Sequence, residues 1–176
     1  MIWRKAVAPM RFIPLILAIC LAASPAAAQA WKEYEYPDYA FTVSFPSEPK
    51  VETTSYALAD GRKMPAQVYS ARQGEGLFKM TVVDLSKSGL DDKAVMDHAL
   101  KTLSAGGEVK LDIEHRISRV YGRQLSILGT DGTRTSVAVF YHKQRLYQIE
   151  GKSPATGSGT SEAIRFQQSL VFTDSD

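Results

Sequence analysis

The segment at residues 39–46, with the sequence YAFTVSFP, constrains the fold more than any other part of the chain. Phe41, Val43 and Phe45 alternate with small or polar residues, which is the two-residue period of a strand that buries one face. The closing Pro46 has no N–H to donate to a sheet and therefore marks the end of the strand. We expect the rest of the chain to cover or extend this apolar face.

Residues 1–30 have the pattern of a secretory signal peptide. A basic start is followed by an apolar run from Phe12 to Ala23 and then by small residues. We prefer cleavage before Trp31, with cleavage before Gln29 as the alternative. An uncleaved membrane anchor is disfavoured, because the apolar run is shorter than the ~20 residues that span a bilayer. We therefore predict a periplasmic or secreted protein without a stable membrane span after processing.

Processing changes both the charge and the cysteine content of the chain. Removing 30 of the 176 residues leaves 146, a length at which one domain can bury a sufficient core. The leader holds three of the 21 basic residues and no acidic residue, so the mature net charge is −1. Cys20, the only cysteine, lies in the leader after the bulky Ile19, which disfavours lipidation. We therefore expect a cysteine-free mature chain that binds no nucleic acid.

Residues 31–38 are aromatic and charged, and we interpret them as an irregular N-terminal arm that precedes a single domain at 39–176. Trp31 is expected to pack on the edge of that domain rather than to bind a ligand. Tyr34, Tyr36 and Tyr39 indicate either an exposed docking strip or packing against the sheet edge, and the sequence leaves both open.

Alternating apolar segments with turn signals between them predict a β-rich domain. Asp60-Gly61, Asp131-Gly132 and Lys143-Gln144 mark tight turns between strands. Residues 77–85 are apolar on both faces, which predicts a central strand covered on both sides. The expected strands after residue 46 are 51–58, 64–72, 77–85, 109–117, 123–128, 133–142 and 145–151.

Two helices are predicted. The first spans 92–105, with Asp91 as its N-cap and Gly106-Gly107 ending it in a left-handed conformation. Its expected buried stripe is Met96, Ala99, Leu100 and Leu103. The second spans about 161–169 after a Ser/Gly-rich loop, with the apolar edge Ala163, Phe166 and Leu170. Val171 and Phe172 are expected to return to the sheet.

Four segments in order, YAFTVSFP at 39–46, PKV at 49–51, RLYQI at 145–149 and FQQSLVF at 166–172, resemble the PsbP-like superfamily of small exported bacterial proteins. The resemblance implies an α+β fold in which helices flank an antiparallel β-sheet as an α/β/α sandwich. It also implies a binding or assembly role, because the plant relatives are extrinsic subunits that support cofactor retention in photosystem II. Their ion-binding residues find no match in this chain, so the resemblance assigns no site.

Motifs for catalysis or metal binding are weak. His98, His115 and His142 fall on separate predicted elements without metal-ligand spacing. Residues 47–50 match S-x-x-K, but the prolines at 46 and 49 argue against the helix that this motif needs. Gly157-Ser158-Gly159 suggests an anion site, and a flexible loop is the better interpretation. We therefore assign no catalytic, cofactor-binding or metal-binding residue and expect no cofactor.

Three functions remain as hypotheses. The leading one is an exported, non-enzymatic binding or accessory protein of the bacterial cell envelope, monomeric, with an unknown envelope protein or small ligand as partner. The second is a periplasmic hydrolase or transferase whose site gathers distant residues such as His115, His142 and Asp131. The third is a protein that binds an apolar ligand between sheet and helix.

Overall fold

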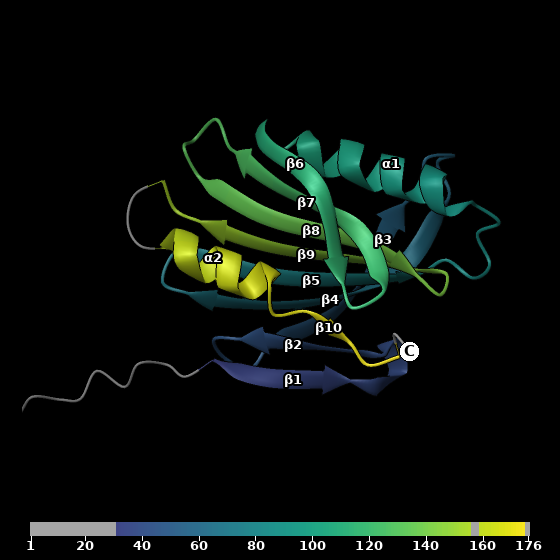
Figure 1. Cartoon of the computed structure of the whole chain (residues 1–176), viewed down its shortest axis with the longest axis horizontal. Helices are drawn as coiled ribbons and strands as arrows, with labels where there is room; N and C mark the ends of the chain where they lie inside the picture. Colours follow the sequence, from purple (N-terminus) through teal and green to yellow (C-terminus); the bar gives the residue numbers. More distant parts are fainter. Residues whose placement is uncertain (1–30, 156–158, 175–176) are drawn as a thin grey trace, which may run out of the picture.

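The structure is a computed structural model that describes residues 31–155 and 159–174 (Figure 1). The proposed leader, Cys20 and most of the Gly157-Ser158-Gly159 segment lie outside the described residues. The helical elements are η1 (Pro37–Tyr39), α1 (Asp92–Ser104) and α2 (Gly159–Gln167). The strands are β1 (Lys32–Tyr36), β2 (Phe41–Phe45), β3 (Lys50–Ala57), β4 (Lys63–Gln73), β5 (Gly76–Asp84), β6 (Glu108–Ile117), β7 (Val120–Leu128), β8 (Arg134–His142), β9 (Arg145–Ser153) and β10 (Val171–Phe172).

Seven strands form one antiparallel sheet in the order β3-β4-β5-β9-β8-β7-β6. Consecutive hairpins connect β3, β4 and β5 in a first series and β6, β7, β8 and β9 in a second series. The segment that contains α1 carries the chain from β5 to β6 at the far edge of the sheet. The second series then returns strand by strand until β9 pairs with β5. The predicted meander is confirmed, and β3 and β6 are left as the two edges of this sheet.

Alternate side chains of the large sheet belong to two different cores. Phe78, Met80 and Val82 of β5 pack in the cluster that also contains Phe166 of α2. The neighbouring Val83 packs in the cluster of α1. The prediction that this strand is covered on both sides is therefore confirmed, and so is the coarse fold of an antiparallel sheet with flanking helices.

Phe41–Phe45 is β2, the middle strand of a separate small sheet with the order β1-β2-β10 (Figure 1). The side chains of Phe41, Val43 and Phe45 are fully buried against the aromatic cluster of α2 and the large sheet. The segment thus builds the core as expected, but it covers the large sheet instead of belonging to it. The predicted return of Val171–Phe172 is a pairing with β2 alone.

The irregular N-terminal arm was a wrong prediction. Residues 32–36 form β1, which pairs with β2 from Lys32 opposite Phe45 to Tyr36 opposite Phe41. The sequence KEYEY has a period of two, because Tyr34 and Tyr36 face the core while the two glutamates face solvent. Two tyrosines alone are too weak an apolar pattern to predict a strand. The segment forms a strand because it pairs with β2.

The predicted turns are confirmed by backbone conformation. Gly61 and Gly132 have φ of 84° and 79°, which residues with a side chain rarely adopt. Lys143 and Gln144 both have positive φ and join β8 to β9 as a two-residue turn. A further two-residue turn at Ser118-Arg119 was missed, so β7 begins at Val120 and not at residue 123.

The first helix begins as predicted and ends differently. The side chain of Asp91 accepts a hydrogen bond of 2.7 Å from the backbone N–H of Ala94. At the other end Ala105 stays right-handed, and neither Gly106 nor Gly107 has positive φ, so the predicted left-handed ending was wrong. The buried stripe is also rotated, because Val95 and Ala99 are its fully buried members.

Residues 109–117 were predicted to form a strand with one face exposed to solvent and an apolar face buried. In the structure most of the apolar face is accessible to solvent as well. Leu111 and Ile113 are 39% and 44% exposed. The reason is that β6 is the edge of the large sheet, beyond the area that α2 and β10 cover (Figure 1). The apolar period of β6 was correctly recognised, but its environment depends on strand order, which the period does not contain.

Alkaline titration of Tyr36 tests whether β1 packs on the core, because this tyrosine belongs to β1 and is partly buried there. Desolvation, with a smaller contribution from Tyr34, raises the pKa of Tyr36 to about 12. Because the folded pKa lies above the unfolded value of 10, the stabilisation is complete below pH 10 and is lost as the pH rises to about 12. We expect Tyr36→Phe to remove a late phenolate absorbance step near pH 12. An unchanged titration curve would contradict the buried position of Tyr36.

Candidate binding groove between α1 and the β6–β7 hairpin

An open groove of about 630 Å³ lies between α1 and the hairpin of β6 and β7. A smaller hollow of about 160 Å³ shares Met96 and Tyr121 with it and extends it toward the start of α1. We call the two together the α1 groove. The residues that line it are Asp92, Lys93, Met96, Asp97, Leu100, Glu114, Tyr121, Gly122, Arg123 and Tyr141.

The groove follows from how α1 sits on the sheet. Val95 and Ala99 are buried in the core, so the helix is fixed on that face. Met96 and Leu100 each lie one residue further around the helix and are only partly buried. They form an apolar floor beside β7, and Tyr121, with 68% of its surface exposed, stands at the rim.

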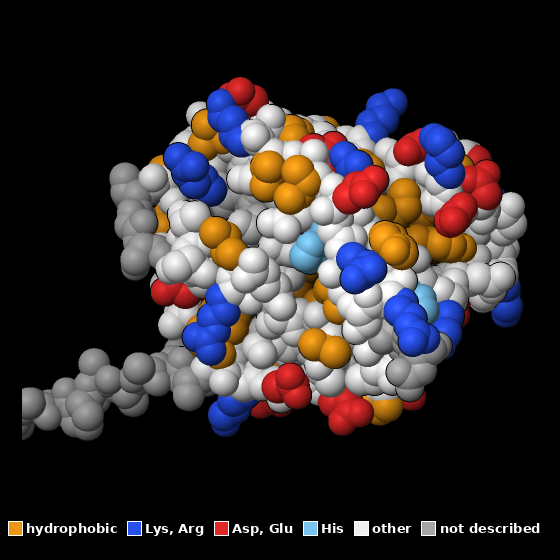
Figure 2. All heavy atoms as spheres, in the orientation of Figure 1, with side chains coloured by type: hydrophobic (Ala, Val, Ile, Leu, Met, Phe, Trp, Pro, Cys, Tyr) orange, Lys and Arg blue, Asp and Glu red, His pale blue; other side chains and the backbone are white. Residues whose placement is uncertain are grey.

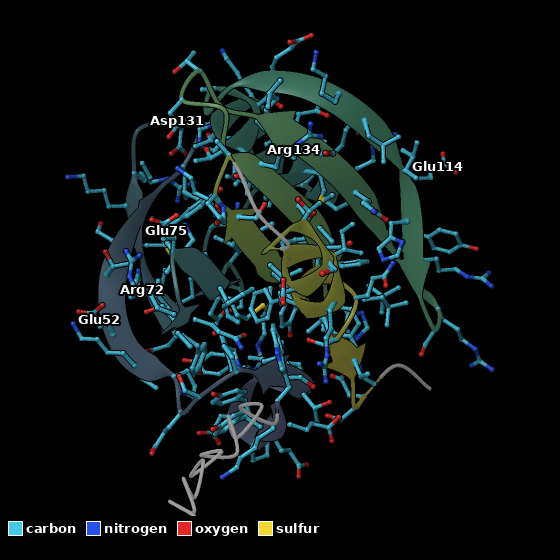
Figure 3. All side chains as sticks on the ribbon, turned by 90° about the vertical axis from the view of Figure 1, so that its left-hand side faces the viewer. Glu52, Arg72, Glu75, Glu114, Asp131 and Arg134 are labelled. Carbon is cyan, nitrogen blue, oxygen red and sulfur yellow. The ribbon has the colours of Figure 1, made fainter. Side chains whose placement is uncertain are left out.

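Most charges at the groove are paired. Lys93 and Asp97 are 2.5 Å apart on α1. The guanidinium of Arg123 donates from Nε and Nη2 to Oδ1 of Asp112 at 3.0 and 2.6 Å. Glu114, opposite Arg123 in the register, forms no ion pair or hydrogen bond within the described part of the chain. Its carboxylate is therefore free to meet a ligand, and Figure 3 shows it on the outer side of β6.

Two other hollows, of about 250 and 390 Å³, meet at the β4–β5 turn and share Glu75 and Pro154. Figure 3 shows Arg72 and Glu75 at this end of the molecule. Gly159 lines the smaller hollow and Ala155 lines the larger one. Glu162 lies in the first turn of α2 and lines the smaller hollow, so a negative charge stands where the suggested anion site would be.

The structure does not bring the three histidines together. Nε2 of His98 lies 2.9 Å from the carbonyl oxygen of Ala57. His115 packs on Phe140 with ring centroids 5.6 Å apart, and desolvation lowers its pKa. No cluster of three or more His, Cys, Asp or Glu side chains suited to a metal ion occurs among the described residues.

His142 and Asp131 belong to opposite ends of β8. His142 is 3.0 Å from Asp174, while Asp131 accepts hydrogen bonds from the N–H and hydroxyl of Thr133. The strand between them spans nine residues, roughly 30 Å at the usual rise. The proposed gathering of His115, His142 and Asp131 into a hydrolytic site is therefore wrong.

The N-terminal aromatic residues pack on the core. Trp31 lies 5.0 Å from Phe78 between ring centroids, and the guanidinium of Arg165 lies 4.9 Å from the Trp31 ring. The ring centroids of Tyr36 and Tyr69 are 4.1 Å apart. The packing interpretation of Trp31 is confirmed, and of the two alternatives for the tyrosines the structure favours packing over a docking strip.

The residues of the α1 groove were not identified from the sequence as a site. Met96 and Leu100 were assigned to the buried stripe of the helix, and Tyr121 and Glu114 were not singled out. The signal that was missed is the short turn at Ser118-Arg119, because it places Tyr121 and Glu114 near each other on adjacent strands. None of the described helices is long and apolar enough to cross a membrane.

The fold defines the class: an α+β domain in which helices flank an antiparallel sheet. Among solved structures, the solution structure of cyanobacterial PsbP (CyanoP) from Synechocystis sp. PCC 6803 is similar, with a TM-score of 0.53. The alignment covers 86% of this chain and 97% of that chain at 8% sequence identity, which shows a common fold. No protein-family model matches the chain, and no curated protein sequence matches it.

Proposed function

We propose that the chain is an exported, non-enzymatic binding or accessory protein of the bacterial cell envelope, and that the α1 groove is its recognition surface. The observation that carries the proposal is the composition of the groove. It combines an apolar floor, the exposed aromatic ring of Tyr121 at the rim and the unpaired carboxylate of Glu114, a mixture typical of surfaces that bind protein segments. The signal-peptide pattern and the binding roles of PsbP-like proteins support the same function.

The groove suits a protein partner better than the alternatives. The large side chains of the two core clusters are almost completely buried, so the described space between sheet and helices is filled. The groove itself is flanked by Asp97, Glu114 and Arg123, whose charges disfavour a purely apolar ligand. No pairing of a nucleophile with a base lines it, so a hydrolase or transferase has no support there.

Site-specific photo-crosslinking in intact cells tests this function. A photoreactive residue at Tyr121 should give a discrete product in the periplasmic fraction that Met96→Asp weakens. The matched control is the same group at Val51, which is 55% exposed on the opposite edge strand. Equal products from both positions, or none from Tyr121, would contradict the assigned surface.

N-terminal sequencing should find a mature chain that begins at Trp31, and sedimentation should find a monomer.

A further inference from the structure

The edge strand β6 has open backbone groups whose positions follow from its register. Ile117 and Val120 close the two-residue turn, and such a closing pair exchanges both of its backbone hydrogen bonds. Hydrogen-bonded pairs recur at every second residue of an antiparallel strand, so the backbone groups of the odd-numbered residues from 111 to 117 form hydrogen bonds with β7. The N–H and C=O groups of Asp112, Glu114 and Arg116 therefore point away from the sheet.

One face of β6 offers apolar side chains beside this open backbone. Leu111 and Ile113 follow each other on the face that continues to His115 and Ile117, and they are 39% and 44% exposed. Figure 2 shows hydrophobic side chains at the surface where β6 crosses the front of the molecule. A strand added to β6 would gain apolar neighbours on this face.

The other face of β6 carries charges, and all but one of them have a partner. Asp112 pairs with Arg123 at 2.6 Å, and the Arg116 guanidinium lies 5.7 Å from the centre of the Tyr121 ring. Glu108 and Lys110 pair with each other at 2.6 Å near the register shift between Val109 and Leu111, which interrupts the alternation of faces. Glu114 is the exception, and it also lines the α1 groove. This face therefore attracts a positive charge at one defined point along the strand.

The opposite edge of the sheet lacks this combination. On β3, Lys50 pairs with Glu52 at 2.7 Å, and Val51 is its single large exposed apolar side chain. The remaining exposed positions of β3 are threonine, serine and alanine. The two edges therefore differ in what they can recognise, and β3 provides an internal comparison.

We propose that β6 binds an extended segment of a partner protein by strand addition, and that this segment alternates basic and apolar residues. Its basic side chain lies beside Glu114 and extends toward the α1 groove, while its apolar side chains lie beside Leu111 and Ile113. The segment's backbone pairs with Asp112, Glu114 and Arg116. This proposal rests on the proposed function and specifies the chemistry of the partner.

Synthetic peptides test the proposal directly. The probe is an eight-residue capped peptide that alternates lysine and valine, and the control has the same composition in two blocks of four. Titration of the mature protein, followed by amide NMR and hydrogen exchange, should protect the N–H groups of Asp112, Glu114 and Arg116. The block peptide should bind at least about tenfold more weakly, because it cannot present one charge face and one apolar face.

Two variants separate the backbone contribution from the charge. Glu114→Gln keeps the strand and removes the charge, so binding should weaken about two- to fivefold, the range for an exposed ion pair. Glu114→Pro removes the same charge and also an N–H that faces outward, so the fold is retained and binding should fall at least about tenfold. The difference between the two variants measures the backbone contribution. A peptide methylated on alternate backbone nitrogens makes the same test without changing the protein.

Each contrary result has a distinct meaning. Shifts confined to Met96 and Leu100, with β6 amides unchanged, would retain the groove and overturn strand addition. Equal binding of the alternating and block peptides, or protection of β3 amides, would also overturn it. Concentration-dependent protection of β6 without peptide would assign the edge to a second copy of this chain and overturn the proposed partner. Failure of the Tyr121 crosslink alone counts against the proposed function.

Discussion

Replacing Phe166 with alanine is expected to lower the free energy of unfolding by about 4 kcal/mol. The ring is fully buried, and its centroid lies 4.9 Å from that of Phe45 and 5.4 Å from that of Phe78. It also lies 6.3 Å from Trp31. One side chain of α2 thus contacts both sheets and the N-terminal aromatic residue, and alanine would leave a cavity that these elements cannot easily close.

Denaturant unfolding, followed by the fluorescence of Trp31, measures this loss. Trp31 is the only tryptophan in residues 31–176, so its signal reports on the same cluster. Ile164→Ala is the matched control, because this side chain lies on the same helix and is 39% exposed. Its effect should stay within about 0.5 kcal/mol. Equal losses in the two variants would contradict the central position of Phe166.

The parts of the fold that the sequence predicted depend on local chemistry. The cap at Asp91 and the turns at Asp60-Gly61 and Lys143-Gln144 each need only a few neighbouring residues to form. The alternation of residues 77–85 was equally informative, because a strand that is apolar on both faces has to be covered on both sides. The cap and the turns were confirmed because no distant part of the chain decides them, and the strand because its own two apolar faces require cover.

The features that were missed depend on pairing between distant segments. The tyrosines at 34 and 36 become part of a strand because β2 lies beside them, and β2 itself covers the large sheet instead of joining it. The exposure of Leu111 and Ile113 depends on β6 being last in the strand order. The same period of apolar residues would have been buried in the middle of the sheet.

The α1 groove was not predictable for the same reason. Its floor comes from α1 and its rim from a hairpin that begins after the helix, and their contact is set by how Val95 and Ala99 seat the helix. Glu114 is one acid among many in the sequence. It stands out only when the neighbouring acid and base, Asp112 and Arg123, are seen to pair with each other.

Replacing Gly151 with valine is expected to separate α2 from the sheet, at a cost of about 3 kcal/mol in the free energy of unfolding. A Cβ at this position would stand 2.5 Å from the carbonyl oxygen and 2.7 Å from the Cα of Ala163. These are backbone atoms of α2, so the helix has to move as a whole. The melting temperature should fall by roughly 6–12 °C.

The control for Gly151→Val is Gly106→Ala, where the closest atom to the added Cβ is the carbonyl oxygen of Leu103 at 3.3 Å. This change should cost less than about 0.5 kcal/mol. The double variant of Gly151→Val and Phe166→Ala should lose less stability than the two single losses combined, because both act on the seating of one helix. Full additivity would show that α2 stays in place when Gly151 is replaced, and would contradict the direct packing of Ala163 on β9.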